Sequence, residues 1–75
     1  MKIKLWEDTN IKTYGDVRRA YHWCTTTLGM PDGIRWKYGK DTPDFLGSFI
    51  ISSPEEIEFI EFFDEQDAVA FKLIF

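Results

Sequence analysis

The sequence contains few of the residues with which small proteins brace a fold or build a reactive centre. Its 75 residues include one cysteine, Cys24, and one histidine, His22. A disulfide within the chain needs a second cysteine, and a structural zinc site needs about four Cys or His ligands. Both kinds of brace are therefore excluded, and the lone cysteine is typical of a protein kept in a reducing compartment.

Long apolar runs are also missing from the chain. The longest unbroken run extends from Ala68 to Phe71, whereas a membrane-spanning helix needs about 20 apolar residues. Glu7 and Asp8 interrupt any leader-like pattern at the beginning of the sequence. We therefore expect a cytoplasmic protein with no membrane partner, organised as a single domain over residues 1–75.

Pairs of reactive side chains are absent as well. His22 and Cys24 are two residues apart in a predicted helix, so their side chains point in different directions. The acidic groups at Asp41, at Asp44 and in residues 64–67 match no calcium-binding loop. The scattered glycines form no phosphate-binding motif. These absences predict a protein without enzymatic activity, metal or cofactor.

Charge and aromatic residues are divided unevenly between the two parts of the chain. Residues 1–40 carry eight basic and four acidic side chains, whereas residues 41–75 carry one basic and nine acidic side chains. Every Trp and Tyr lies in the first part, and every Phe lies in the second. Because Trp and Tyr suit half-wet surfaces and Phe suits a dry core, the first part is expected to be the more surface-active.

The first two thirds of the chain predict one helix and three strands. Apolar residues at helical spacing over 14–28 predict a helix, which Thr13 and Asp16 begin with a weak capping-box pattern and Gly29 ends. Alternation of apolar and polar residues predicts strands, and a run of β-prone residues predicts a further one. The three strands lie over 2–6, 34–38 and 46–52.

The remaining residues allow two interpretations, both of which give an α+β fold with helices on one face of an antiparallel sheet. Ser53, Pro54 and Glu56 form a helix-start pattern, which favours a helix over 54–65 and a strand over 71–75. The order is then β-α-β-β-α-β, the ferredoxin-like or split β-α-β arrangement, which we favour narrowly. The alternative places a turn at 55–56, a strand over 57–63, where aromatic and β-branched residues are frequent, and a final helix over 67–75.

About fifteen residues at the C-terminus carry a recognisable pattern. Phe62 is followed, four intervening residues later, by Asp67-Ala68, and then by Phe71-Lys72-Leu73 and a final aromatic residue, Phe75. This ending resembles that of small orphan accessory proteins of tailed bacteriophages, many of which have Trp at the last aromatic position. The resemblance implies a phage protein that acts in the host cytoplasm by binding and inhibiting a host protein, including components of host defence. In such proteins the segment before Asp-Ala looks like a strand, which supports the alternative interpretation.

Two surfaces are candidates for binding that protein partner by steric docking. Asp16, Arg19 and Trp23 share the outward stripe of the predicted helix 14–28, and the last two are within cation–π reach. A solvent-facing Trp beside Arg has the composition of an interface hot spot, although Trp23 could instead cover an edge of the core. Glu58 and Glu61 would lie on one face of the helix 54–65 and present negative charge to a basic partner.

Two further hypotheses concern other kinds of partner. Basic residues beside an aromatic one on an open sheet face predict a small nucleic-acid-binding regulator, although a net charge of −4 opposes it. The side chains of this alternative surface are Lys2, Lys4, Trp6, Arg35 and Lys37. The third hypothesis is self-association through the surplus phenylalanines of residues 57–63.

Overall fold

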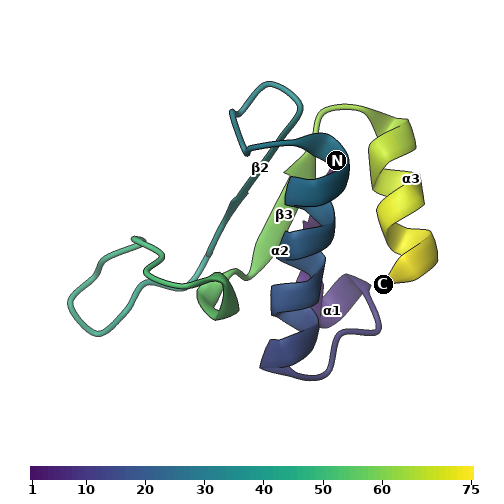
Figure 1. Ribbon diagram of the computed structural model, residues 1–75. Helices are drawn as coiled ribbons and strands as arrows, with labels where there is room; N and C mark the ends of the chain where they lie inside the picture. Colours follow the sequence, from purple (N-terminus) through teal and green to yellow (C-terminus); the bar gives the residue numbers. More distant parts are fainter.

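The computed structural model describes all 75 residues as a three-stranded antiparallel sheet with two long helices packed on one face (Figure 1). The α+β class expected from the sequence is confirmed. None of the helices is both long enough and apolar enough to span a membrane. In chain order, the elements are β1 (Lys2–Lys4), α1 (Leu5–Asp8), α2 (Tyr14–Leu28), β2 (Trp36–Gly39), the short 3-10 helix η1 (Pro54–Glu56), β3 (Phe59–Phe62) and α3 (Glu65–Ile74).

The last strand in the sequence, β3, lies in the middle of the sheet. It pairs antiparallel with β1 on one side and with β2 on the other. Ile3 lies opposite Ile60, and Trp36 lies opposite Phe62. Because side chains alternate between the two faces of a strand, these four residues share the face that the helices cover.

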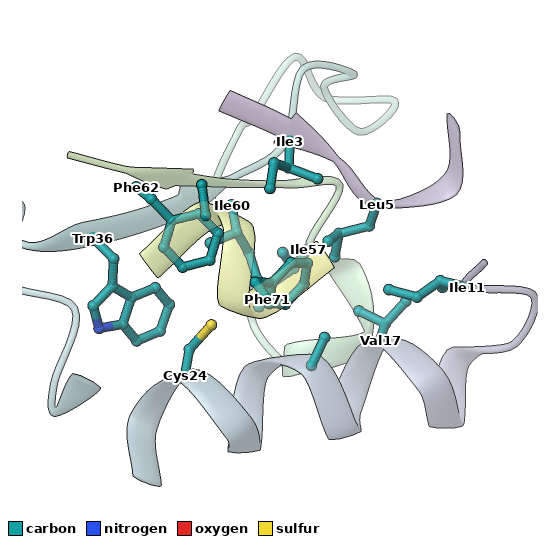
Figure 2. Close-up of a cluster of buried hydrophobic side chains, with 12 residues drawn as sticks. Ile3, Leu5, Ile11, Val17, Cys24, Trp36, Ile57, Ile60, Phe62 and Phe71 are labelled. Atoms are coloured by element: carbon teal, nitrogen blue, oxygen red, sulfur yellow. The ribbon is translucent and has the colours of Figure 1, made fainter. Parts of the chain in front are cut away.

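The core lies between that face and the helices. Figure 2 shows its side chains pointing into one space between the sheet and α2. Val17 and Cys24 enter it from α2, and Phe71 enters it from α3. All twelve buried residues are apolar. The one indole nitrogen in this core, that of Trp36, donates a hydrogen bond of 2.9 Å to the carbonyl of Gly29, so no buried polar side-chain atom lacks a partner.

The helix α2 forms over the residues predicted for it, because the signals that define it are local. The Thr13 hydroxyl accepts a hydrogen bond from the Asp16 N–H at 3.1 Å, and the Asp16 carboxylate accepts one from the Thr13 N–H at 3.1 Å. These two bonds complete a capping box. Gly29 ends the helix with a φ of +90°, a conformation that side chains disfavour.

The favoured interpretation of residues 54–65 is wrong, and the alternative is confirmed. Ser53 and Glu56 do form a capping box, but the helix that they begin ends after one 3-10 turn. The chain then enters β3, where Ile60 and Phe62 are buried against the helices. Two neighbouring strands supply partners for β3, and this pairing outweighs the helix-start signal.

Two other predicted strands are also wrong. Residues 46–52 form a loop without strand pairing, and residues 71–74 belong to α3. The ferredoxin-like order needs four strands, whereas this sheet has three, so that order is not found.

The two remaining predicted strands form over shorter or shifted ranges. The first ends at Lys4, because Asp8 accepts the Lys4 N–H at 3.0 Å and the chain turns into α1. The second begins at Trp36, because Asp32 accepts the N–H groups of Ile34 and Arg35 and holds them in a turn.

The capping box gives a first prediction. Replacing Thr13→Ala removes the acceptor for the Asp16 N–H and should lower the free energy of unfolding by about 1 kcal/mol. Urea denaturation followed by tryptophan fluorescence measures this as a lower midpoint. The matched control is Thr26→Ala on the same helix, where the hydroxyl bonds only to the His22 carbonyl. That change should be neutral or slightly stabilising, because alanine favours helix. Equal losses in both variants would contradict the role of the cap.

Candidate functional site

The tryptophan proposed for docking, Trp23, lies at the edge of the core. Its ring meets Phe71 edge-on at 5.7 Å and Phe75 at 6.5 Å between ring centroids. The Arg19 guanidinium pairs with the Asp16 carboxylate, and both cation–π contacts in the chain are made by lysines. The alternative in which Trp23 covers an edge of the core is therefore what the structure shows.

The third member of that stripe, Asp16, stabilises the start of α2. Its carboxylate accepts the N–H groups of Lys12 and Thr13 at 3.0 and 3.1 Å. The bond from Lys12 makes the largest contribution to holding the pKa of Asp16 below its usual value, with smaller contributions from Thr13 and Arg19. Asp16 is thus used in starting α2, and the predicted stripe offers no free hot spot.

Glu58 and Glu61 do not share a helix face, because the helix that would have carried them does not form. Glu58 precedes β3, and its carboxylate accepts the Thr42 N–H at 2.8 Å. Glu61 lies in β3 directly between Lys2 of β1 and Lys37 of β2. Glu58 therefore fastens a loop, and Glu61 balances the charge of two neighbouring lysines.

The structure brings together three of the five residues proposed for nucleic acid. Lys2, Lys4 and Lys37 lie on the sheet face that no helix covers, but each has an acidic neighbour. The Lys2 ammonium also lies 4.2 Å from the centroid of the Phe59 ring. The three ion pairs are Lys2–Asp41 at 2.9 Å, Lys37–Glu61 at 3.6 Å and Lys4–Glu7 at 3.9 Å.

The other two residues of that set, Trp6 and Arg35, lie apart from the lysines. Trp6 is on α1 and meets the ring of Tyr14 edge-on at 5.5 Å. Arg35 binds the Asp67 carboxylate through two nitrogens at 3.0 and 3.3 Å, and this bond raises the pKa of its guanidinium. The five residues therefore do not form one continuous basic and aromatic surface.

Several exposed apolar residues lie in and next to residues 46–52, where sequence reasoning placed a strand. The connection between β2 and η1 extends away from the rest of the molecule (Figure 1). Over residues 44–50, here called the apolar loop, Phe45 is 95 % exposed, Leu46 78 %, Phe49 57 % and Ile50 75 %. The sequence shows these residues as a β-prone run. Whether they are buried or exposed depends on whether a neighbouring strand of the sheet pairs with them.

A network around Asp44 holds the apolar loop in one conformation. The Asp44 carboxylate accepts the N–H groups of Leu46 and Ser48, each at 2.9 Å. The Asp44 N–H donates to the Ser48 carbonyl, and Gly47 completes the turn with a φ of +80°. The backbone bond from Ser48 is the main reason that the pKa of Asp44 lies below its usual value.

The two arms of the connection are fastened to the domain. Asp41 binds Lys2 on one arm, and on the other arm Glu56 accepts the N–H groups of Ser52 and Ser53. Ile51 packs against the core. The loop is therefore presented by the domain as a fixed projection.

A groove of about 500 Å³ lies beside the base of this projection. Glu55, Glu56 and Glu58 line it, together with Lys40. Glu55 pairs with Arg18, and the other two glutamates accept backbone N–H groups from residues 42, 52 and 53. These carboxylates support the loop and are not aimed at a common point, and no group of three or more His, Cys, Asp or Glu side chains is placed to hold a metal ion.

The only thiol of the chain, Cys24, is buried in the core. Loss of solvent raises its pKa to about 12, and the negative charge of Asp67 adds to this effect. Since the thiolate is the reactive form, Cys24 acts as an apolar packing group.

The burial of Cys24 predicts resistance to thiol reagents. Iodoacetamide at about pH 8 should leave the folded protein unmodified and should label it once urea unfolds the chain, since the free thiol pKa is near 8.5. Mass spectrometry counts the added group. Rapid labelling without denaturant would contradict the burial of the thiol.

The Asp44 network predicts a local pH response. The pKa of Asp44 in the folded protein lies below the ordinary aspartate value of 3.8. The carboxylate therefore remains mostly ionised at pH 3.8, and the network is lost only at lower pH. In an NMR titration, the amide protons of Leu46 and Ser48 should shift together with a midpoint below that value. The transition should vanish in Asp44→Ala and persist in Asp41→Ala, which removes a carboxylate that binds only Lys2. A midpoint above the ordinary value would contradict the network.

Comparison of the chain with protein-family models, with curated proteins and with solved structures finds no match in any of the three. The function is therefore inferred from the residues themselves. The most informative feature is the apolar loop, whose backbone is held by hydrogen bonds to Asp44 and whose large apolar side chains are exposed to solvent.

Proposed function

We propose that this chain is a non-enzymatic protein-binding module that docks through the apolar loop. The observation that carries the proposal is the concentration of four large exposed apolar side chains, two of them aromatic, within residues 44–50. Exposed apolar groups of this kind mark interaction sites when they are gathered together. Aromatic anchors that fill a pocket on the partner dominate the energy of many interfaces.

The fixed shape of the loop favours binding. Docking a flexible loop costs about 0.5–1.5 kcal/mol for each side chain that becomes immobile. Here the Asp44 bonds and the positive φ of Gly47 set the backbone before any partner arrives. The backbone that carries Phe45 and Leu46 is thus ordered in advance, so binding does not have to order it.

Charge around the loop indicates the chemistry of the partner. Between Asp41 and Phe71 the chain has nine acidic residues and no basic one. An anionic membrane or a nucleic acid would be repelled by this part of the surface. An apolar pocket with basic residues around its rim is the complementary surface.

The biological setting follows from the C-terminal pattern. Asp67-Ala68 and Phe71-Lys72-Leu73 support a phage accessory protein in the host cytoplasm. The chain measures 36 × 26 × 19 Å, which is large enough to cover a functional surface of a host protein. Steric inhibition of that protein, including a component of host defence, is the mechanism that needs no chemistry from the chain itself.

The nucleic-acid alternative has less support. Six of the nine basic residues form ion pairs with carboxylates of the same chain. On the uncovered sheet face, Glu61 lies between Lys2 and Lys37. Binding a polyanion there would require breaking these pairs and placing phosphates beside a carboxylate.

The proposed function is tested with two matched leucines. Leu46 is 78 % exposed on the apolar loop, and Leu73 is 82 % exposed on α3. Tagged protein is incubated with bacterial lysate, with and without nuclease, and a protein retained at stoichiometric level is then purified for titration calorimetry. Leu46→Ser should weaken its binding by at least about tenfold, and Leu73→Ser should leave the affinity unchanged.

Two results would overturn this proposal. Equal affinity for the wild type and for Leu46→Ser would remove the loop as the docking element. Retention that disappears on nuclease treatment would favour the nucleic-acid alternative instead. Neither substitution touches the buried core, so circular dichroism spectra of both variants should match that of the wild type.

A further inference from the structure

The second arm of the apolar loop has the properties of a strand without a partner. Residues 48–52 read Ser-Phe-Ile-Ile-Ser, with no charge and no proline. Phenylalanine and isoleucine strongly favour strands. The structure nevertheless places no helix, turn or strand over residues 48–51.

The backbone of this arm has unused hydrogen-bonding groups. The Ile50 N–H donates to the Ser48 hydroxyl at 3.1 Å. The N–H and C=O groups of Phe49 and Ile51 take part in no hydrogen bond within the chain. Along an extended strand, residues two apart direct these groups to the same side, so the free groups form a short edge that can accept another strand.

We propose that two copies of this chain pair through residues 48–52 as antiparallel strands related by a twofold axis at Ile50. In this register Ser48 lies opposite Ser52, Phe49 lies opposite Ile51, and Ile50 lies opposite Ile50 of the second copy. Phe49 and Ile51 are then the hydrogen-bonded pairs and exchange four N–H···O=C bonds across the axis. These are the residues whose backbone groups are free, and Ile50, whose N–H is already used, takes the non-hydrogen-bonded position.

The local sequence favours a second copy as the occupant of this edge. Each copy carries a net charge of −4, which opposes association of two copies through their acidic surfaces. Residues 45–53 contain no charged side chain, and pairing there joins neutral surfaces. The sequence is also self-complementary about Ile50, with serine opposite serine and apolar opposite apolar, as an isologous interface requires.

The available area sets the expected strength. The pairing covers Phe49 and Ile50, which are 57 % and 75 % exposed. Since a phenylalanine side chain buries about 150–250 Å² when fully covered, these residues offer only part of the area of about 1,000 Å² that a specific interface needs. The dimer is therefore weak and depends on concentration.

This inference goes beyond the proposed function, because it concerns the free protein and is tested without a host partner. It also implies competition. Pairing covers Phe49 and Ile50, so a partner that uses the whole apolar loop binds the monomer.

The first test is sedimentation equilibrium of the purified protein from about 1 μM to about 1 mM. We expect a reversible monomer–dimer equilibrium within this range. In Ile50→Lys, two ammonium groups face each other across the axis, and association should weaken by at least about tenfold. Ile50→Glu should have the same effect through two carboxylates. Ile50 is 75 % exposed, so neither change disturbs the core, and tryptophan fluorescence verifies folding.

The decisive test mixes the two variants. Because the proposed axis passes through Ile50, lysine in one copy then faces glutamate in the other, and a 1:1 heterodimer should form where each variant alone is monomeric. The control pair, Leu73→Lys and Leu73→Glu, places the same charges on α3 and should leave wild-type association unchanged. A monomer up to about 1 mM, a dimer that survives Ile50→Lys, or a mixture that stays monomeric would each overturn the proposal.

Discussion

The packing of β3 against α3 and α2 is the interaction on which the rest of the structure depends. β3 is the only strand with a neighbour on each side, so β1 and β2 have no sheet without it. Its residues Ile60 and Phe62 are buried, and the ring of Phe62 lies 5.2 Å from that of Phe71 on α3. A chain of this size buries only about 60 % of its unfolded surface, so the loss of one such contact removes much of its stability. Without a disulfide or a metal, aromatic packing around this strand provides the brace.

The surface is organised by ion pairs, whereas the core is organised by apolar packing. Most basic side chains are neutralised by carboxylates of the same chain, including those that the sequence placed in a nucleic-acid surface. Three of the six Trp and Tyr side chains, Tyr21, Trp23 and Tyr38, pack at the edge of the core. Few basic side chains therefore remain free to bind a partner, and the unusual feature of the surface is the exposed apolar loop. Interaction through the loop is consistent with both the lack of reactive groups and the excess of acidic charge around it.

The parts of this structure that sequence reasoning predicted are those with local causes. The helix over 14–28 was correct because its cap, its apolar stripe and its terminal glycine all lie within it or next to it. Residues 54–63 were not settled, because the capping box of Ser53 and Glu56 and the strand preference of the following residues point in opposite directions. Only the presence of β1 and β2 on both sides decides between them. The apolar loop shows the converse case, in which local strand preference is strong but the sheet offers no neighbour. For the same reason the candidate site could not be located from the sequence, since exposure of Phe45 and Leu46 is a property of the whole fold.

The central position of β3 also affects how the chain is made. β1 pairs with a strand that lies far away in the sequence, with Lys4 opposite Phe59. At about 5–20 residues per second, a ribosome needs roughly 3–11 s to synthesise the chain between these two positions. During that time Ile3, which is buried in the folded protein, has no sheet to join, although α2 is complete before β3 is made. The β-prone residues 48–52 also emerge before β3 does. The newly made protein thus passes through a stage in which β1 and residues 48–52 are both exposed. Once residues 59–62 are available, β1 is paired, whereas residues 48–52 remain without a partner strand.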